Sequence, residues 1–463
     1  MKSNTFSMAL CGKPGSISPT RIIVVSFCAV ILTGTLLLML PISTRDGSLS
    51  FVDAMFTATS ATCVTGLVVF DTFTKFTPFG QAVVLLLIQI GGLGLVTLTA
   101  FFNVALHKRL GFKSMKLASE SISLDEATGA KPLLYTVMRT SMGFELAGAL
   151  LLMVVMVPKF GIAGIWISIF TAVSAFCNAG FDLFGRIAPY TSLTTFYSNG
   201  YVLAIVMLLI VCGGLGFIVW QELFMFRRRH KMSLHAKLAI AVTVTLIIVG
   251  ALAIGLLEWD NPATMGKFST GEKVMSSLFQ SITCRTAGFN TIDQASMHTL
   301  SKLASVILMF IGACPGGTGG GIKGTTAIIL FFTIISVIQG RGEAVIRGRR
   351  IDKKTVYRAL TIVTLGFTVI LFTTLVMIYD TPMVDGMVDG NFIDCLFEAT
   401  SAFGTVGLSS GVTGQLTSLG KVVTALTMLI GRVGPIAMGM SLASRAGELA
   451  RREILPEAKI VVG

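Results

Sequence analysis

The sequence has little charge for its length. Of its 463 residues, only 13% are Asp, Glu, Lys or Arg, whereas 53% are hydrophobic. A soluble protein has about 25% charged residues. The apolar runs of 19 residues or more are also apolar on all faces of a helix, whereas the surface helices of soluble proteins keep one polar face. The composition therefore favours an integral membrane protein over a soluble one.

Clustered metal ligands and catalytic motifs are missing as well. The eight cysteines occur singly, with no CxxC pair and no histidine at ligand spacing, so the sequence predicts neither a disulfide framework nor a zinc site. The chain has no HExxH motif, no paired intramembrane aspartates and no Ser/His pair. We therefore expect that the protein is not an enzyme and that the chain itself holds no cofactor.

The net charge of +13 could indicate a nucleic-acid-binding protein, but its distribution is typical of membrane topology. Five segments outside the apolar runs hold 25 of the 36 Lys and Arg residues: 1–21, 107–139, 227–237, 340–358 and 445–463. This bias predicts that both termini are cytoplasmic. The opposite side carries carboxylates that are expected to raise the local cation concentration: Asp380, Asp385, Asp389, Asp394 and Glu398.

One short segment occurs four times in the chain. Aligned on its last residue, it reads FTATSATCVTG, FTAVSAFCNAG, LFQSITCRTAG and FEATSAFGTVG, and the four copies end at Gly66, Gly180, Gly288 and Gly407. The glycines are separated by 114, 108 and 119 residues. The chain is therefore predicted to consist of four copies of one module.

Each copy combines a long apolar run, a short apolar run that ends in the glycine segment, and a second long run. The long runs can cross a membrane, whereas about 12 residues cannot. The predicted crossings are 22–40, 79–106, 133–157, 201–226, 238–257, 303–338, 359–378 and 422–442, and the predicted re-entrant segments are 51–62, 164–176, 274–284 and 392–403. The repeats span 22–106, 133–226, 238–338 and 359–445, between cytoplasmic tails at 1–21 and 446–463.

The four glycine segments predict a pore. Non-helical backbone inside a membrane must be buried in protein or line water, and four loops satisfy this condition together if they meet on one axis. Any single glycine could simply end a helix, so the prediction depends on all four copies. Carbonyl groups at such loops can replace the hydration shell of a cation. The predicted ion-binding residues are Val64, Thr65, Gly66, Asn178, Ala179, Gly180, Thr286, Ala287, Gly288, Thr405, Val406 and Gly407.

The third returning run is interrupted at 312–324, where six of the last nine residues are glycine. Such a segment cannot stay helical. It is not a Walker A loop, because Lys323 is followed by Gly324. On the residues alone, a simple kink against a neighbouring helix remains an alternative.

The four copies, the VTGL, NAGF, RTAGF and TVGL loops, and the glycine-rich interruption together resemble the Trk/Ktr/HKT superfamily of potassium transporters, most closely its bacterial KtrB subunits. The resemblance covers about residues 21–445. It implies an all-α integral membrane protein in which four helix, re-entrant helix and helix (M1-P-M2) repeats surround one pseudo-fourfold pore. It also implies passage of K+, sometimes of Na+, in a bacterial plasma membrane, a homodimer, and a cytoplasmic nucleotide-binding ring of the RCK/KtrA type. The resemblance allows Na+ and ATP or ADP to act on the system through that partner.

The resemblance further implies that the interruption is an intramembrane gate. Arg432 lies in the middle of the last run, where a charge is costly and normally faces a cavity or a partner. It is interpreted as a barrier residue beside the loop, with an ion pair to a neighbouring repeat as the alternative. The predicted gate residues are Gly312, Pro315, Gly316, Gly317, Thr318, Gly319, Gly320, Gly321, Lys323 and Arg432.

Two more ionisable residues lie within apolar or loop segments. Arg285 is predicted to brace its loop from behind, because a cation lining the pore would repel K+. Glu145 is either a proton or cation site or, as we favour, a hydrogen-bond partner of a neighbouring helix. The sequence leaves a second mechanism open, a secondary transporter that couples K+ to H+ or Na+, although such folds usually show two related halves.

Overall fold

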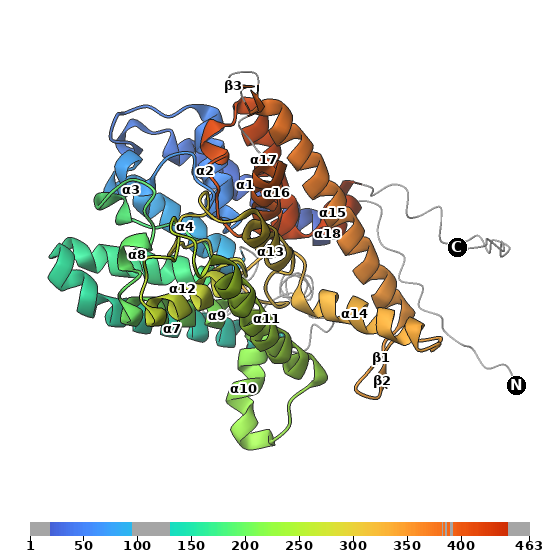
Figure 1. Ribbon diagram of the computed structural model, residues 1–463. Helices are drawn as coiled ribbons and strands as arrows, with labels where there is room; N and C mark the ends of the chain where they lie inside the picture. Colours follow the sequence, from blue (N-terminus) through green and yellow to red (C-terminus); the bar gives the residue numbers. More distant parts are fainter. Residues whose placement is uncertain (1–18, 95–129, 382, 385–386, 389–391, 443–463) are drawn as a thin grey trace, which may run out of the picture.

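The chain is mainly α-helical in the computed structural model, which describes residues 19–94, 130–381, 383–384, 387–388 and 392–442 (Figure 1). The first module contains α1 (Pro19–Leu38), η1 (Pro41–Ser43), α2 (Phe51–Thr62), α3 (Thr72–Lys75) and α4 (Pro78–Leu93). The second contains α7 (Ala130–Phe160), α8 (Ala163–Cys177), η3 (Phe184–Arg186), η4 (Thr194–Phe196), α9 (Gly200–Gly214) and α10 (Phe217–Arg229).

The third module contains α11 (Leu234–Glu258), α12 (Thr270–Thr283), α13 (Thr299–Phe310) and α14 (Gly324–Ile338). It is followed by an antiparallel hairpin of β1 (Val345–Ile346) and β2 (Arg349–Arg350). The fourth contains α15 (Lys353–Asp380), the hairpin of β3 (Met383–Val384) and β4 (Met387–Val388), α16 (Phe392–Gly404), η5 (Thr413–Gln415), α17 (Ser418–Val433) and α18 (Pro435–Leu442).

Four described helices are long and apolar enough to cross a membrane, namely the first helix of each module. We call α1, α7, α11 and α15 the outer helices. They carry large apolar side chains on the surface of the protein, including Leu36, Leu146, Leu256 and Leu375, as helices in contact with lipid do. The fold is therefore that of a multi-pass membrane protein.

The helix α2 shows how the sequence sets a short re-entrant helix. The side chain of Ser50 caps its N-terminus by accepting a hydrogen bond from the amide of Asp53 at 3.2 Å. Val64, with φ of 58°, cannot continue the helix. The 12 residues extend about 18 Å, which is well short of a bilayer core of about 30 Å. The predicted segment 51–62 is confirmed, and α8, α12 and α16 are the corresponding re-entrant helices.

The four modules close into a ring. We call α4, α9, α13 and α17 the inner helices, because each follows a glycine loop. Each inner helix packs against the re-entrant helix of the next module: α4 on α8, α9 on α12, α13 on α16, and α17 on α2. The last of these contacts joins the fourth module to the first and completes the circle.

The prediction that three returning segments are continuous helices is wrong. Only the break in the third was expected, but α4 ends before Gly94, α9 before Gly216 and α17 before Gly434, whose φ values are 79°, 92° and 96°. Glycine adopts positive φ without the steric penalty of a Cβ atom. The helix α10 consequently leaves α9 at 97°. The part of the predicted run 79–106 beyond Gly94 lies outside the described residues.

Candidate functional site

The four glycine loops share one unusual backbone conformation. In each loop, the residue two positions before the final glycine is not a glycine yet has positive φ: Val64 58°, Asn178 61°, Thr286 71° and Thr405 50°. The final glycines also have positive φ: Gly66 91°, Gly180 69°, Gly288 81° and Gly407 94°. Positive φ in residues with a side chain persists only where the surroundings hold it, and it is concentrated at functional sites.

The loops meet in a closed circle. A Cβ atom built on Gly66 would lie 2.3 Å from the carbonyl oxygen of Ala179, and one on Gly180 would lie 2.8 Å from that of Ala287. The same contact follows from Gly288 to Val406 at 2.6 Å and from Gly407 to Thr65 at 2.2 Å. Each glycine therefore faces the carbonyl that precedes the glycine of the next loop, and any side chain at these positions would collide with that carbonyl. The residues predicted to bind ions are thus brought together.

The re-entrant helices hold the loops from behind. The amides of Gly66 and Gly407 donate to the hydroxyls of Ser60 and Ser401, each at 3.1 Å. In the third module, the hydroxyl of Thr283 donates to the carbonyl of Phe289 at 2.7 Å. Since all four helices end at these loops, the negative ends of their dipoles are directed there, which favours a cation.

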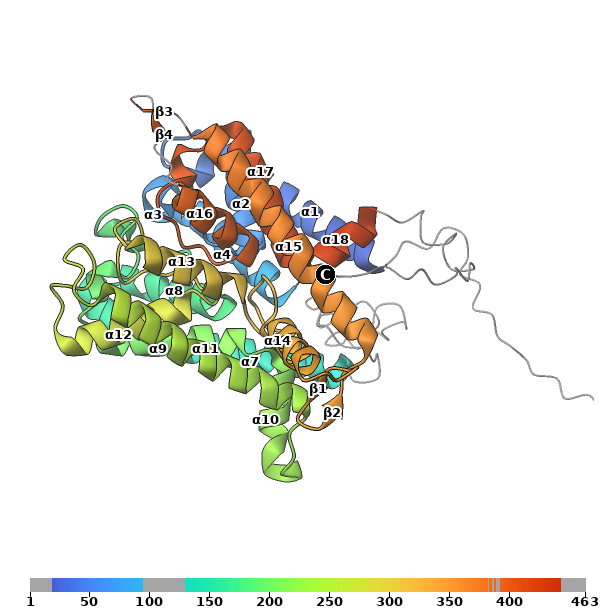
Figure 2. The same ribbon diagram turned by 45° about the vertical axis from the view of Figure 1, so that its right-hand side comes forward.

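The segment between α13 and α14, shown in Figure 2, lies against three of the four loops. The hydroxyl of Thr318 donates to the carbonyl of Phe176 at 3.1 Å, and the amide of Gly320 donates to the hydroxyl of Thr405 at 3.0 Å. A Cβ atom on Gly319 would lie 2.0 Å from the hydroxyl oxygen of Thr286. Residues 318–321 therefore press directly on the glycine loops of the second, third and fourth modules.

The break between α9 and α10 anchors this segment. The amides of Cys314 and Thr318 donate to the carbonyls of Gly214 and Gly213 at 3.0 and 3.2 Å, and the amide of Phe217 donates to the carbonyl of Gly316 at 2.9 Å. The sequence reading missed this anchor. The signal was present, since the motif Gly-Gly-Leu-Gly occurs at both 91–94 and 213–216.

The base of the segment is closed by its own residues. The amide of Gly312 donates to the carbonyl of Ile322 at 2.8 Å, and the ammonium of Lys323 donates to the carbonyl of Gly319 at 2.6 Å. Gly316 and Gly321 have positive φ, of 72° and 67°, which explains part of the high glycine content. Pro315 and Gly317 lie within the same turn.

Arg432, in the last turn of α17, links the segment to the first module. Its guanidinium donates to the carbonyl of Thr318 and to that of Gly91, and also to that of Gly92 at 3.2 Å. Its described partners are thus carbonyl oxygens, and no ion pair of Arg432 occurs in the described part of the chain. In the described part of the chain, neutral carbonyls therefore take the place of the carboxylate that the ion-pair alternative requires.

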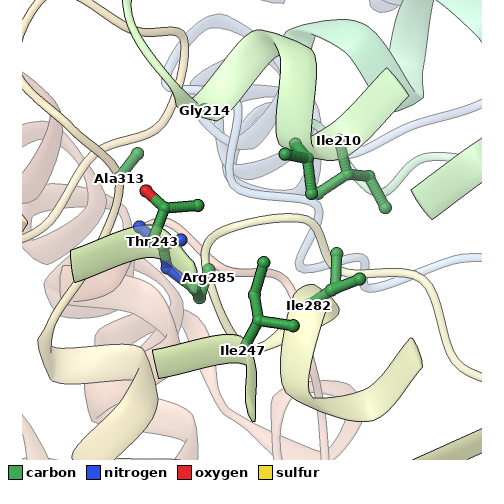
Figure 3. Close-up of a pocket in the computed structure, with 8 residues that line it drawn as sticks. Ile210, Gly214, Thr243, Ile247, Ile282, Arg285 and Ala313 are labelled. Carbon is green, nitrogen blue, oxygen red and sulfur yellow. The ribbon is translucent and has the colours of Figure 1, made fainter. Parts of the chain in front are cut away.

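Arg285 lies in a small pocket between α9, α11 and α12. Figure 3 shows its side chain beside Thr243, Ile247 and Ala313, with Ile210, Gly214 and Ile282 completing the wall. The residue is only 7% exposed. The helix α11 is the outer helix of the third module. The guanidinium of Arg285 therefore lies on the side of its loop that faces this outer helix.

The acidic residues expected on the outer face are mostly engaged. Glu398 is fully buried, and its carboxylate accepts hydrogen bonds from the hydroxyl of Ser409 at 2.5 Å and from the amide and hydroxyl of Thr413 at 3.2 and 3.0 Å. Its assignment as a surface charge is wrong, because α16 turns this side chain inward onto the segment after Gly407. Asp394 is paired with Lys302 at 2.7 Å. Asp385 and Asp389 lie outside the described residues.

Asp182, two residues beyond Gly180, was not singled out from the sequence. The amide of Phe184 donates to its carboxylate at 2.9 Å. Removal from water, together with the nearby carboxylate of Asp71, raises the pKa of Asp182 to about 7. This loop therefore carries an acid that titrates near neutral pH.

Glu145 forms the hydrogen bond that was favoured over an ion site. The amide nitrogen of Gln89, on α4, lies 3.1 and 3.2 Å from its two carboxylate oxygens. The thiol of Cys177, at the end of α8, lies 3.9 Å from one of them.

Comparisons with known proteins agree with this architecture. Residues 11–445 match the sequence model of the family described as "TrkH: Cation transport protein". The chain is 39% identical over 451 residues to the potassium/sodium uptake protein NtpJ of Enterococcus hirae, covering 96% of this chain and 98% of that protein. It is 39% identical over 427 residues to the Ktr system potassium uptake protein B of Bacillus subtilis, covering 92% and 93%.

A solved structure shares the fold. The crystal structure of the potassium transporter TrkH from Vibrio parahaemolyticus superposes with a TM-score of 0.71 at 18% identity, covering 95% of this chain and 87% of that one. At this identity the likeness concerns the fold, and it extends over all four modules.

Proposed function

The chain belongs to the TrkH family of cation transport proteins, and we propose that it is the potassium-conducting membrane subunit of a Ktr-type uptake system. The family consists of transporters, so the protein is not an enzyme. The observation that carries the proposal is the closed circle of contacts from Gly66 through Gly180 and Gly288 to Gly407. Four backbone segments in one conformation around one axis suit a bare, spherical cation.

In this proposal, K+ loses its water in the circle and is bound by carbonyl oxygens of the four glycine loops. Thr65, Ala179, Ala287 and Val406 supply the carbonyls that face the glycines. The glycines are required because a Cβ atom would displace these oxygens. The dipoles of the four re-entrant helices offset part of the cost of dehydrating the ion.

Residues 318–321 and Arg432 close the path beneath the circle. The segment touches three glycine loops, and the guanidinium of Arg432 bridges it to the carbonyls of Gly91 and Gly92 in the first module. The cations of Arg432 and Lys323 oppose the entry of K+ by charge repulsion. Opening requires the segment to leave Phe176 and Thr405, which in turn requires Arg432 to release Thr318.

We further propose that the protein works as a homodimer with a cytoplasmic nucleotide-binding ring of the RCK/KtrA type, in the bacterial inner membrane with both termini cytoplasmic. Three of the matching relatives are named as members of Ktr systems, which supports the need for a partner. The basic linkers support the orientation. Na+ and ATP or ADP would then act through the partner, with K+ as the transported ion.

The name of NtpJ includes sodium, which favours one second candidate, a carrier that couples K+ to Na+ or H+ through the same pore. Flux through purified full-length protein in liposomes tests both candidates. A K+ gradient alone should set the reversal potential at the K+ equilibrium value. A reversal potential that shifts with an imposed Na+ or proton gradient would support coupling, and an absence of K+ flux would refute both.

A further inference from the structure

The carboxylate of Glu145 connects three helices of two modules. It lies on the outer helix α7 and is only 9% exposed. Gln89 of α4 donates to both of its oxygens, at 3.1 and 3.2 Å, and the thiol of Cys177 at the end of α8 lies 3.9 Å from one oxygen. One side chain thus holds an outer helix, an inner helix and a re-entrant helix together.

The described hydrogen-bond partners of Glu145, Gln89 and Cys177, are neutral. No ion pair of Glu145 is seen in the described part of the chain. A carboxylate inside a membrane is costly and is kept where it serves a function or a specific contact. Both of its oxygens accept from the amide of Gln89, whereas a glutamine at this position would offer a single acceptor oxygen.

The last turn of α4 connects the hydrogen bond of Glu145 with the contacts of Arg432. Gln89 and Gly92 are three residues apart and therefore lie on one face of the helix. That face packs on Cys177, since a Cβ atom on Gly92 would lie 2.6 Å from its sulfur. The carbonyls of Gly91 and Gly92, in the same turn, are the acceptors of Arg432.

We propose that Glu145 is a positioning residue for the gate: it fixes the last turn of α4 against α8, so that the carbonyls of Gly91 and Gly92 stay where Arg432 binds them. This inference rests on the proposed function. Glu145 touches neither the ion nor the closing segment, and it acts through Gln89 and Arg432. Loosening the turn weakens the grip of Arg432 and favours the open state.

The test is K+ flux through purified full-length protein in liposomes without any partner. Glu145→Gln replaces one of the two acceptor oxygens with an amide donor, and the flux should rise about tenfold, corresponding to about 1.4 kcal/mol. The exchange Gln89→Glu with Glu145→Gln places the carboxylate on α4 and the amide on α7, and should restore the low flux. In an Arg432→Ala background, Glu145→Gln should cause no further rise, since coupled residues are not additive.

Glu258→Gln is the matched control. Glu258 is fully buried, and in the described part of the chain its carboxylate accepts from the side chains of Asn261 and Thr264 and from the backbone amide of His298. It lies at the end of α11, away from Arg432. Its flux should equal that of the wild type. A similar rise in this variant would show that any lost buried carboxylate loosens the protein and would overturn the proposal.

Three further results would also overturn it: unchanged flux in Glu145→Gln, high flux in the exchanged pair, or a rise that adds to that of Arg432→Ala. If Glu145→Gln does not fold, the exchanged pair alone decides, because low flux supports the proposal and high flux opposes it. Failure of both variants to fold would assign Glu145 a structural role only. An absence of K+ flux in the wild type would instead refute the proposed function.

Discussion

Replacing Gly407 with serine should reduce the preference for K+ over Na+. Gly407 has φ of 94°, and a Cβ atom there would lie 2.2 Å from the carbonyl oxygen of Thr65. Because this oxygen belongs to the proposed ion site, the contact cannot be relieved without moving an ion ligand. The preceding contact in the circle, from Gly288 to Val406, would be disturbed as well.

The size of the effect follows from the overlap. Ordinary carbon–oxygen contacts are no shorter than about 3.2 Å, so the oxygen of Thr65 or the backbone of Gly407 must move by about 1 Å. Errors of this size in a preorganised site are typically worth about 100-fold in function. Since a bare ion is held by several oxygens, we expect the K+/Na+ permeability ratio to fall by at least about tenfold, or about 1.4 kcal/mol.

Gly411→Ser is the matched control. Gly411 has a similar φ of 101°, but nothing lies within 4 Å of a Cβ atom built there. Both variants carry the strain of positive φ, and only Gly407→Ser carries the collision. Reversal potentials under K+/Na+ bi-ionic conditions measure the ratio. Unchanged selectivity in Gly407→Ser, or an equal loss in Gly411→Ser, would refute the assignment of the circle as the selective site.

Five other changes test the proposed closure and the residues around it. Arg432→Ala should raise partner-independent K+ flux in liposomes, and Arg432→Lys should do so less, because a lysine cannot reach Thr318 and α4 together. Deletion of 316–321 should also raise this flux, and a silent deletion would exclude the segment as a gate. Glu398→Gln should lower the melting temperature, because the amide keeps only one acceptor oxygen and leaves a donor of Ser409 or Thr413 without a partner, at a cost of about 1–3 kcal/mol. Folding raises the pKa of Asp182 to about 7, so its ionisation destabilises the folded protein as the pH rises. The melting temperature of Asp182→Asn, relative to that of the wild type, should therefore increase between about pH 4 and about pH 8.

The four-module arrangement could be predicted from the sequence because its signals are local. A short apolar segment before a glycine predicts a re-entrant helix without knowledge of its neighbours, and 51–62 matches α2 to the residue. The convergence of the loops followed from a general condition on backbone in a membrane. The identity of the atoms in contact, such as Gly66 facing Ala179, required the structure, because sequence spacing does not set the order of loops around an axis.

The breaks in the inner helices could not be predicted from hydrophobicity alone. A glycine in a long apolar run is compatible with a membrane helix, so Gly94, Gly216 and Gly434 gave no clear signal. The structure shows what requires the glycines at the start of these motifs. In each of these modules, a Cβ atom on the first glycine of the motif would lie 1.9 Å from a carbonyl oxygen near the end of the re-entrant helix. The pairs are Gly91 with Thr62, Gly213 with Phe176, and Gly431 with Phe403. Alignment of the four returning runs with one another would have revealed the shared motif.

Glu398 was misplaced for a different reason. Its position in a re-entrant helix could be predicted, but the direction of its side chain depends on where the chain after Gly407 folds. Ser409 and Thr413 return to α16 and satisfy the carboxylate. The sequence indicates which helix carries such a residue. Its hydrogen-bond partners can be identified only when the fold of the segment after the glycine loop is known.

Arg432 differs from the residues at the equivalent position of the other three modules, whereas the four glycine loops are alike. In the motif at the break of each inner helix, which reads Gly-Gly-Leu-Gly at 91–94, the second position is Gly92 in the first module and Gly214 in the second. It is Ala313 in the third module and Arg432 in the fourth. In the proposed function, selection uses backbone carbonyls, which every module can supply, so the four loops remain alike. The proposed closure uses one long side chain, that of Arg432, which extends from α17 to α4 and Thr318. Four arginines at this level would compete for the same space and repel one another. The small residues of the other three modules therefore leave the space in which the side chain of Arg432 can cross the path. Gly92→Arg should therefore prevent the observed closure by displacing Arg432, and a variant that retained wild-type flux and regulation would contradict this account.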